Sequence, residues 1–395
     1  MSEIYANYNS TSPIWDDIPI VIEPYLIEKF HNPSDPSSKE IKNNLEQVRQ
    51  QVSSFLGTSP KDQIVFTASA TESIFQAFFG FFSANNFKGT IVTSKIEHSA
   101  VLETARYLQL HFSIDAIYVP VLGEGKVDFQ SYCDVLKSLK NYDLPVLVSM
   151  MHANNETGVI QDIALCALEA KKYGFYFHSD LTQSCGKIPV SFSELQLDYA
   201  SITAHKLGGI KGTGALLIKE NAPFLPVMTG GGQENGLRGG TESVVSIIAL
   251  GKAIEKIQEY QRQKEEVTIE QIRDAFEERF FSQNPTAKKT TTANRLPNTS
   301  HILLSGIVAQ ELVKNVAERN CVISSGSACH QSNLEPSHVL LAMGLSEMQA
   351  LSAIRVSFGF FSTIEDAIDL ADILSEEIEL LSQKSQNELK TLLTG

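Results

Sequence analysis

Short apolar runs recur along the first half of the chain, and stretches with helical spacing separate them. Each run is apolar at consecutive positions, which is typical of strands buried on both faces of a parallel sheet. The runs are "QIVFTAS", "GTIVTS", "LPVLVSMM", "GFYFHSD", "YASITAH" and "GALLI". The pattern therefore predicts an α/β fold in which helices cover both faces of a mainly parallel sheet.

One early helix carries signals at both of its ends. Ser37 and Glu40 have the spacing of a capping box, and Gly57 supplies a stop. The apolar positions that share one face of this helix are Ile41, Leu45, Val48, Val52 and Phe55.

The second half of the chain has a different pattern. Residues 245–283 are helical in spacing and become highly charged, which indicates a bridge with one solvated face. Strands are predicted at "TSHILL", "NCVISS" and "IRVSFG", and a long helix follows from residue 363. We therefore expect a large domain over 15–255 and a smaller α+β domain formed by 1–14 with 256–395.

Composition narrows the class of protein. The chain has 395 residues and a net charge of −14, which argues against nonspecific binding to nucleic acid or to an anionic membrane. No signal segment and no membrane-spanning run is evident. The five cysteines form no CxxC pair. We expect neither disulfides nor a metal site, and we expect a reducing, cytoplasmic location.

Lys206 is the first candidate for chemistry, because it follows the apolar run "YASITAH" and precedes a glycine-rich turn. A surface lysine is one interpretation. A lysine buried at a strand end has a lowered pKa and forms Schiff bases with aldehydes, of which pyridoxal phosphate is the common cofactor.

Three further positions suit such a cofactor. Asp180 follows another strand and can keep a pyridine nitrogen protonated, although a helix cap is an alternative. His98 can lie flat against a ring, and Asn155 and Gln183 can hydrogen-bond a phenolic oxygen. A packing histidine and ordinary loop amides are the alternatives.

A phosphate needs hydroxyls and backbone N–H groups, and a helix start supplies them. The stretch "SATES" lies between a strand and a helix, and Thr203 and His205 end another strand. The glycine-dense segment 228–243 contains Arg238 and Thr241, and its Thr241 hydroxyl is a further candidate for the same phosphate.

A second functional signal lies in residues 321–346. Cys321 begins an apolar run and is predicted to be buried. Cys329 lies among Ser, Gly and Ala beside His330, where a free thiol on a mobile loop suits a nucleophile. Arg355 ends another strand and can grip a substrate carboxylate, or form a structural ion pair.

Together these stretches resemble the NifS/IscS-type cysteine desulfurases, in the class V aminotransferase group of fold-type-I pyridoxal phosphate enzymes. The likeness covers nearly the whole chain. The matching stretches are "SATES", "IEHSAV", "HANNETGVIQDI", "HSDLTQSCGKIPV", "AHKLGGIKGTGAL", "GGGQENGLRGGTES", "SSGSACHQSNLEPSHVLLAMGLS" and "RVSFG". The resemblance implies a seven-stranded, mainly parallel sheet with a smaller α+β domain.

The resemblance also implies a role for each position. Lys206 would carry the cofactor's Schiff base and move the substrate α proton, Asp180 would pair with the pyridine nitrogen, and His98 would stack on the ring and help with proton transfer. Asn155 and Gln183 would contact the phenolic oxygen.

The phosphate would be held by Ala70, Thr71, Thr203 and His205, joined by Thr241 from the other subunit of a homodimer. Arg355 with Asn155 would hold the substrate carboxylate. Cys329 would attack the sulfur of L-cysteine and become a persulfide, releasing alanine, and would pass the sulfur to an acceptor or scaffold protein for iron–sulfur clusters, thio-cofactors or tRNA thiolation.

The sequence departs from the family pattern near its start. The family pattern Asp-Asn-Asn-Ala-Thr-Thr reads "NYNSTS", with Asn7 and Tyr8 in place of Asp and Asn, and a family histidine near Ser37 is missing. Two alternative functions are a selenocysteine lyase or other class V enzyme, in which Cys329 is dispensable, and a non-catalytic subunit that docks sulfur-transfer partners.

Overall fold

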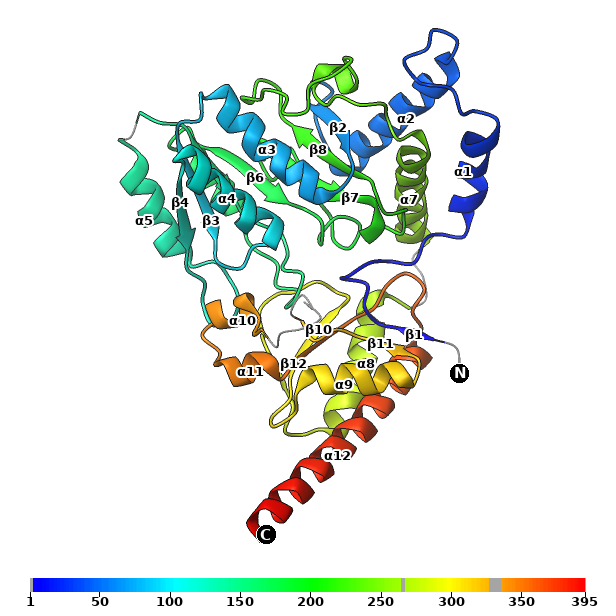
Figure 1. The fold of residues 1–395 in the computed structure, drawn as a ribbon, viewed down its shortest axis with the longest axis vertical. Coiled ribbons are helices and arrows are strands. Elements are labelled where there is room, and N and C mark those ends of the chain that lie inside the picture. The colour runs from blue at the N-terminus through cyan, green and yellow to red at the C-terminus, as the bar shows by residue number, and fades with distance from the viewer. Residues whose placement is uncertain (1–2, 142, 264–266, 327–334, 395) are drawn as a thin grey trace.

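The computed structural model describes residues 3–141, 143–263, 267–326 and 335–394, with side chains as far as Lys384. Its larger part is built on a seven-stranded sheet (Figure 1). The strand order is β2-β8-β7-β6-β5-β3-β4, and only β8 runs antiparallel to its neighbours. The predicted α/β fold with a mainly parallel sheet is therefore confirmed.

The six apolar runs correspond to six of these strands, and the seventh is β4. The strands are β2 (Gln63–Thr67), β3 (Thr90–Ser94), β4 (Asp115–Val119), β5 (Val146–Ser149), β6 (Tyr176–Asp180), β7 (Tyr199–Thr203) and β8 (Gly214–Ile218). Strand β4 lies at the sheet edge and is buried only at Val119, so its sequence lacks the continuous apolar character of the others.

Consecutive residues of each central strand enter different cores. In β8, Ala215 and Leu217 pack with α1 (Asp17–Ile27), α2 (Lys39–Leu56), α5 (Phe129–Leu139), α6 (Ile163–Lys171) and α7 (Val244–Gln263). Leu216 and Ile218 pack with α3 (Ala70–Ala84) and α4 (Ser99–Phe112) on the other face. This alternation explains why the strands read as unbroken apolar runs.

Helix α2 ends as predicted but begins differently. Gly57 adopts the left-handed conformation that closes the helix, with φ of 61°. The capping box expected from Ser37 and Glu40 is wrong. The N-cap is Ser38, Ser37 donates instead to Asp35 Oδ1 at 2.9 Å, and Glu40 pairs with Lys29.

A smaller α+β part has its own core. Strands β9 (Lys288–Lys289), β10 (Thr299–Leu303) and β12 (Ala353–Ser357) form one antiparallel sheet, and β1 (Ile4–Tyr5) pairs with β11 (Cys321–Val322). The helices are α8 (Ile269–Gln283), α9 (Ala309–Glu318), α10 (His338–Ala342), α11 (Glu347–Leu351) and α12 (Ile364–Thr394). Ile4 and Ala6 belong to this core although they begin the chain.

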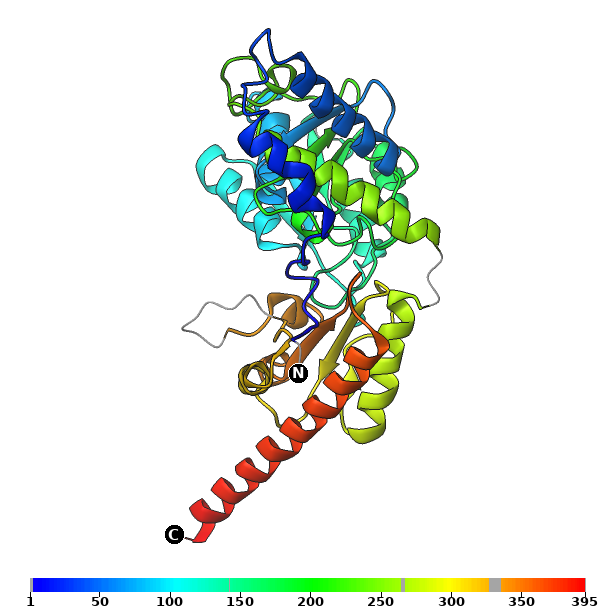
Figure 2. The ribbon, with the colours of Figure 1, turned by 90° about the vertical axis from the view of Figure 1, so that its right-hand side faces the viewer.

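The bridge region contains two helices, α7 and α8, and α8 begins with a capping box between Thr268 and Gln271. The domain boundary that the sequence places after residue 255 falls inside α7, and the division into domains stays a prediction. Figure 2 shows residues of the N-terminal segment passing between the two parts of the molecule. Of the helices in the described residues, none is long and apolar enough to cross a bilayer.

Candidate active site

The carboxyl ends of strands β6 and β7 bring two predicted site residues to one edge of the sheet. The two strands are parallel neighbours, with Asp180 opposite Ser201. Asp180 is the last residue of β6, and a 3₁₀ turn over Ala204–Lys206 follows β7. This edge is where ligands bind in open α/β sheets, because the loops that follow the strands converge there.

The glycines after Lys206 form the turn that fixes its position. Gly208 has a φ of 78°, and a β-carbon there would lie 2.5 Å from Nε1 of Trp15. The same indole nitrogen donates to the carbonyl of Leu207 at 3.0 Å. Only glycine combines this close approach to Trp15 with a left-handed backbone. This explains why a glycine stands at position 208.

Lys206 itself is mostly enclosed, and its amine donates to the carbonyl oxygens of Asn9 and Ser10. Burial lowers the pKa of Lys206 to about 7, the Arg355 guanidinium acts in the same direction, and the Asp180 carboxylate opposes both. A large fraction of the amine is therefore unprotonated, and nucleophilic, near neutral pH.

Asp180 and His98 lie within electrostatic reach of Lys206. Asp180 is buried, and its Oδ1 accepts from the Thr182 backbone N–H at 2.9 Å. The His98 ring caps helix α4 through an Nδ1 bond from the Ala100 N–H at 3.1 Å. Partial desolvation lowers the pKa of His98, Asp180 raises it, and the charge at Lys206 lowers it. The net shift lowers the pKa of His98 and favours the neutral imidazole, and the residue is exposed.

Arg355 and Asn155 meet across the boundary between the two parts of the molecule. Arg355 lies in β12 and donates from Nη1 to the Asn155 carbonyl at 2.8 Å. Its Nη2 donates to Oδ1 of Asn7, also at 2.8 Å. The positive charge of the guanidinium lowers the pKa values of both Lys206 and Lys187, so Arg355 acts on the same site as these two lysines.

Asn9 connects more site residues than any position singled out from the sequence. It is 2% exposed, and its carbonyl accepts from Gln183 Nε2 at 2.9 Å as well as from Lys206. Its side chain accepts from Lys187 at 2.8 Å and donates to the Asn155 carbonyl at 3.2 Å.

Sequence reasoning missed Asn9 and Lys187 as site residues. A polar "NYNSTS" between apolar positions, and a lysine in "CGKIPV", were the available signals.

Two of the predicted phosphate residues, Ala70 and Thr71, form the start of α3. Ser69 is the N-cap, and its hydroxyl accepts from the Glu72 N–H at 3.1 Å, so Ala70 and Thr71 supply the free first turn. His205 contacts the Thr11 hydroxyl at 3.1 Å, and burial lowers its pKa to about 4. The Thr203 hydroxyl donates to the Thr213 carbonyl at 3.0 Å, so its proton is directed into the sheet.

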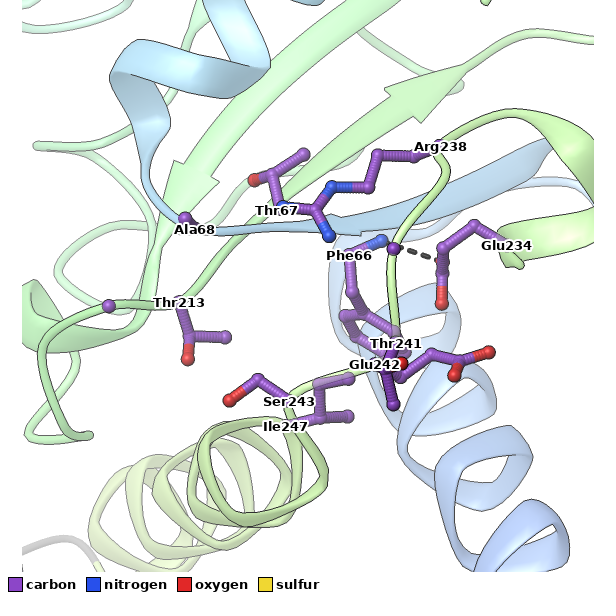
Figure 3. Close-up of a pocket in the computed structure, with 12 residues that line it drawn as sticks. Phe66, Thr67, Ala68, Thr213, Glu234, Arg238, Thr241, Glu242, Ser243 and Ile247 are labelled. Carbon is purple, nitrogen blue, oxygen red and sulfur yellow. Dashed lines mark hydrogen bonds between the residues drawn. The ribbon is translucent and has the colours of Figure 1, made fainter. Parts of the chain in front are cut away.

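Thr241 lines a cavity of about 160 Å³ beside the end of β2 and the start of β8 (Figure 3), and Lys206 does not line this cavity. Arg238, Thr213 and Ser243 also line this cavity, and Arg238 pairs with Glu72 of α3 at 2.9 Å. The predicted role of Thr241 toward a second subunit therefore stays a prediction.

Cys329 falls outside the described residues. C-terminal to residues 327–334, which include Cys329, the Ser337 hydroxyl donates to Oε2 of Glu156 at 2.5 Å, and His338 contacts the Glu97 carbonyl at 3.0 Å. Both contacts join the chain that follows Cys329 to loops of the large sheet.

The donor set fits pyridoxal phosphate. The enclosed amine of Lys206 suits an aldehyde, the buried carboxylate of Asp180 suits a pyridinium nitrogen, and the first turn of α3 suits a phosphate.

Comparison with known proteins identifies the family. The aminotransferase class-V model matches residues 4–370, so the chain belongs to that family. Cysteine desulfurase IscS of Dictyoglomus turgidum is 38% identical over 387 residues, covering 96% of this chain and 95% of that protein.

Two solved structures are similar over most of their lengths. A NifS-like protein superposes with a TM-score of 0.86 and 32% identity, covering 96% of this chain and 100% of the other. The structure described as SspA in complex with cysteine has a TM-score of 0.74 and 30% identity, covering 90% and 98%. These likenesses confirm the fold-type-I architecture.

Proposed function

We propose that this protein is a pyridoxal phosphate-dependent cysteine desulfurase, which converts L-cysteine to L-alanine and transfers the sulfur to Cys329. The observation that carries the proposal is the Lys206 amine, whose pKa is lowered to about 7 between Asp180 and Arg355. A relative that shares 38% identity is a cysteine desulfurase, and a similar structure is described in complex with cysteine.

When bound, pyridoxal phosphate supplies an aldehyde that joins amines and a ring that withdraws electrons from the substrate Cα. Asp180 would hold the proton on the ring nitrogen, and the first turn of α3 with His205 would bind the phosphate. Gln183 and Asn155 would hydrogen-bond the phenolic oxygen, and His98 would cover the ring.

The substrate carboxylate binds the planar fork of Arg355, which sets the orientation of Cα toward Lys206. The Lys206 amine, unprotonated in a large fraction of molecules near neutral pH, takes the proton from Cα and later returns a proton to the product. The Cys329 thiolate attacks the substrate Sγ and forms the S–S bond of a Cys329 persulfide. The Cβ–Sγ bond breaks with its electron pair left on the substrate, and Cβ takes up a proton, so that the other product is alanine.

The enzyme then needs an acceptor for the persulfide sulfur, and we propose a partner or scaffold protein in that role. We also propose a homodimer in which Thr241 reaches the phosphate of the other subunit. The four described cysteines, at positions 133, 166, 185 and 321, are free thiols, which suits a reducing compartment such as the cytoplasm.

The direct test is to incubate purified protein with pyridoxal phosphate and L-cysteine and to measure alanine by chromatography. We expect one alanine for each sulfur transferred to a reducing thiol. Comparison with selenocysteine and with a keto acid separates this activity from that of a selenocysteine lyase or an aminotransferase. A protein that releases no alanine from cysteine would contradict the proposal.

A further inference from the structure

Lys187 is a part-buried lysine whose amine has unusual partners. Its amine donates to Oδ1 of Asn9 at 2.8 Å and to Oε1 of Gln183 at 2.7 Å. Both acceptors are neutral amides, and within the described residues Lys187 forms no ion pair. Buried lysines are ordinarily paired with carboxylates, so this arrangement calls for a reason other than charge neutralisation.

The contact fixes which way the Gln183 carboxamide faces. Its oxygen accepts from Lys187, and its nitrogen donates to the Asn9 carbonyl at 2.9 Å. A flipped amide would place the Gln183 oxygen against the Asn9 carbonyl oxygen, which is repulsive. The amide orientation is therefore set from both ends.

The same Asn9 carbonyl also accepts from Lys206, so the Gln183 amide nitrogen and the Lys206 amine share one oxygen. Among the described residues, the second hydrogen of that amide nitrogen makes no hydrogen bond. The side chain of Asn9 is held in turn by Asn298 at 3.0 Å and by Thr299 at 2.9 Å, from the smaller part of the molecule.

We propose that Lys187 is a positioning residue for the cofactor site, which orients the Gln183 amide nitrogen and the Asn9 carbonyl toward Lys206. It acts through Gln183 and makes no contact with the reacting atoms. This inference rests on the proposed function, because the oriented N–H donor serves the phenolic oxygen of pyridoxal phosphate.

The electrostatics agree with a neutral amine at this position. Burial lowers the pKa of Lys187 well below its ordinary value, the charges of Lys206 and Arg355 act in the same direction, and Cys185 opposes them weakly. A neutral Lys187 adds no third positive charge beside Lys206 and Arg355, yet it still has hydrogens to donate.

The test uses the full chain loaded with pyridoxal phosphate and the Lys187→Met variant, which keeps the length of the side chain and removes its donors. We expect the cofactor dissociation constant to rise about five- to tenfold, the usual effect of losing one orienting hydrogen bond. The pH midpoint of the cofactor's visible absorbance should move upward, because an oriented donor favours the deprotonated oxygen.

Two further variants separate positioning from folding. Gln183→Met should give the same midpoint as Lys187→Met, and the double variant should shift it no further. Lys171→Met is the matched control, since Lys171 is also half-buried with a pKa lowered by burial, but it pairs with Asp198. It should lose stability and keep the wild-type absorbance.

An unchanged midpoint and dissociation constant in Lys187→Met would overturn the inference, as would fully additive shifts in the double variant. If Lys187→Met does not fold, Lys187→Gln provides the same comparison. A wild-type chain that binds the cofactor but makes no alanine contradicts the proposed function alone, and the variant shift would still support the inference. A chain that binds no pyridoxal phosphate overturns both.

Discussion

The guanidinium of Arg355 donates a 2.8 Å hydrogen bond to the side-chain oxygen of Asn7, a neutral amide at the start of the chain. The family pattern that the sequence resembles has an aspartate at this position. Asn7 is neutral, so it holds the guanidinium by a hydrogen bond without adding a carboxylate that would compete with a substrate carboxylate.

Replacing Asn7 with Asp should weaken substrate binding, because a carboxylate at this position competes for the Arg355 fork. We expect the KM for cysteine to rise about fivefold with kcat little changed, which is the difference of about 1 kcal/mol between neutral and charged hydrogen bonds. Steady-state kinetics provide the measurement. Asn32→Asp, on an exposed loop, controls for the added charge, and an unchanged KM in Asn7→Asp would exclude competition for Arg355.

Replacing Gly208 with Ala should destabilise the turn that carries Lys206. The left-handed φ and the overlap with Trp15 together should cost about 2–4 kcal/mol of unfolding free energy. Gly174→Ala is the matched control, because its φ is also positive, at 73°, but its β-carbon would meet nothing within 4 Å. Urea unfolding of both variants isolates the effect of the Trp15 contact on the free energy of unfolding. Equal losses of unfolding free energy in the two variants would show that this contact has no effect.

Glu97 should make stability depend on pH. Burial raises the pKa of Glu97 from 4.5 to about 8, and its carboxyl accepts from Ser94 and from the Met151 N–H. The folded carboxyl keeps a proton that the unfolded one loses. The stability that Glu97 contributes is therefore full below its unfolded pKa and is lost as the pH rises toward about 8.

Glu97→Gln mimics the protonated acid and removes this dependence. Between about pH 5 and about pH 8, the free energy of unfolding of the wild type should fall relative to that of the variant. Denaturant unfolding at both pH values gives the difference, in which other titrating groups cancel. Parallel curves for the two proteins would mean that Glu97 is ionised in the folded state.

Cys329 should be required for sulfur transfer. Cys329→Ala should lower the rate of sulfur release by ~100-fold or more, because no other group is proposed to accept the substrate sulfur. Cys321→Ala serves as control, since Cys321 is buried in the smaller core. Persulfide on the Cys329 peptide is measured by mass spectrometry, and sulfur release at the normal rate in Cys329→Ala would remove its role as nucleophile.

The sequence alone predicted most of the sheet, because strands buried on both faces carry unbroken apolar runs. It also placed Asp180, Thr203 and Lys206 at strand ends, where the structure has them. The sequence did not predict strand β4, because an edge strand with half-exposed residues has no such unbroken apolar run. The start of α2 was misplaced, because Ser37 bonds to Asp35 and leaves Ser38 as the cap.

The hydrogen-bond network around Asn9 and Lys187 could not be predicted from the sequence. Asn9 is separated from Gln183 by 174 positions and from Thr299 by 290, and no local spacing signals such contacts. The amine of Lys187 bonds to Asn9, 178 positions away, as well as to Gln183. The role of Lys187 can be inferred only once its hydrogen-bond partners are known.

The central claim is that Lys206 is the lysine that bonds to pyridoxal phosphate. Borohydride reduction of the loaded protein, followed by proteolysis and mass spectrometry, locates the attached cofactor on one peptide. The account predicts a pyridoxyl group on Lys206, and its disappearance in Lys206→Ala. Attachment to Lys187 or to any other lysine, or no attachment at all, would contradict it.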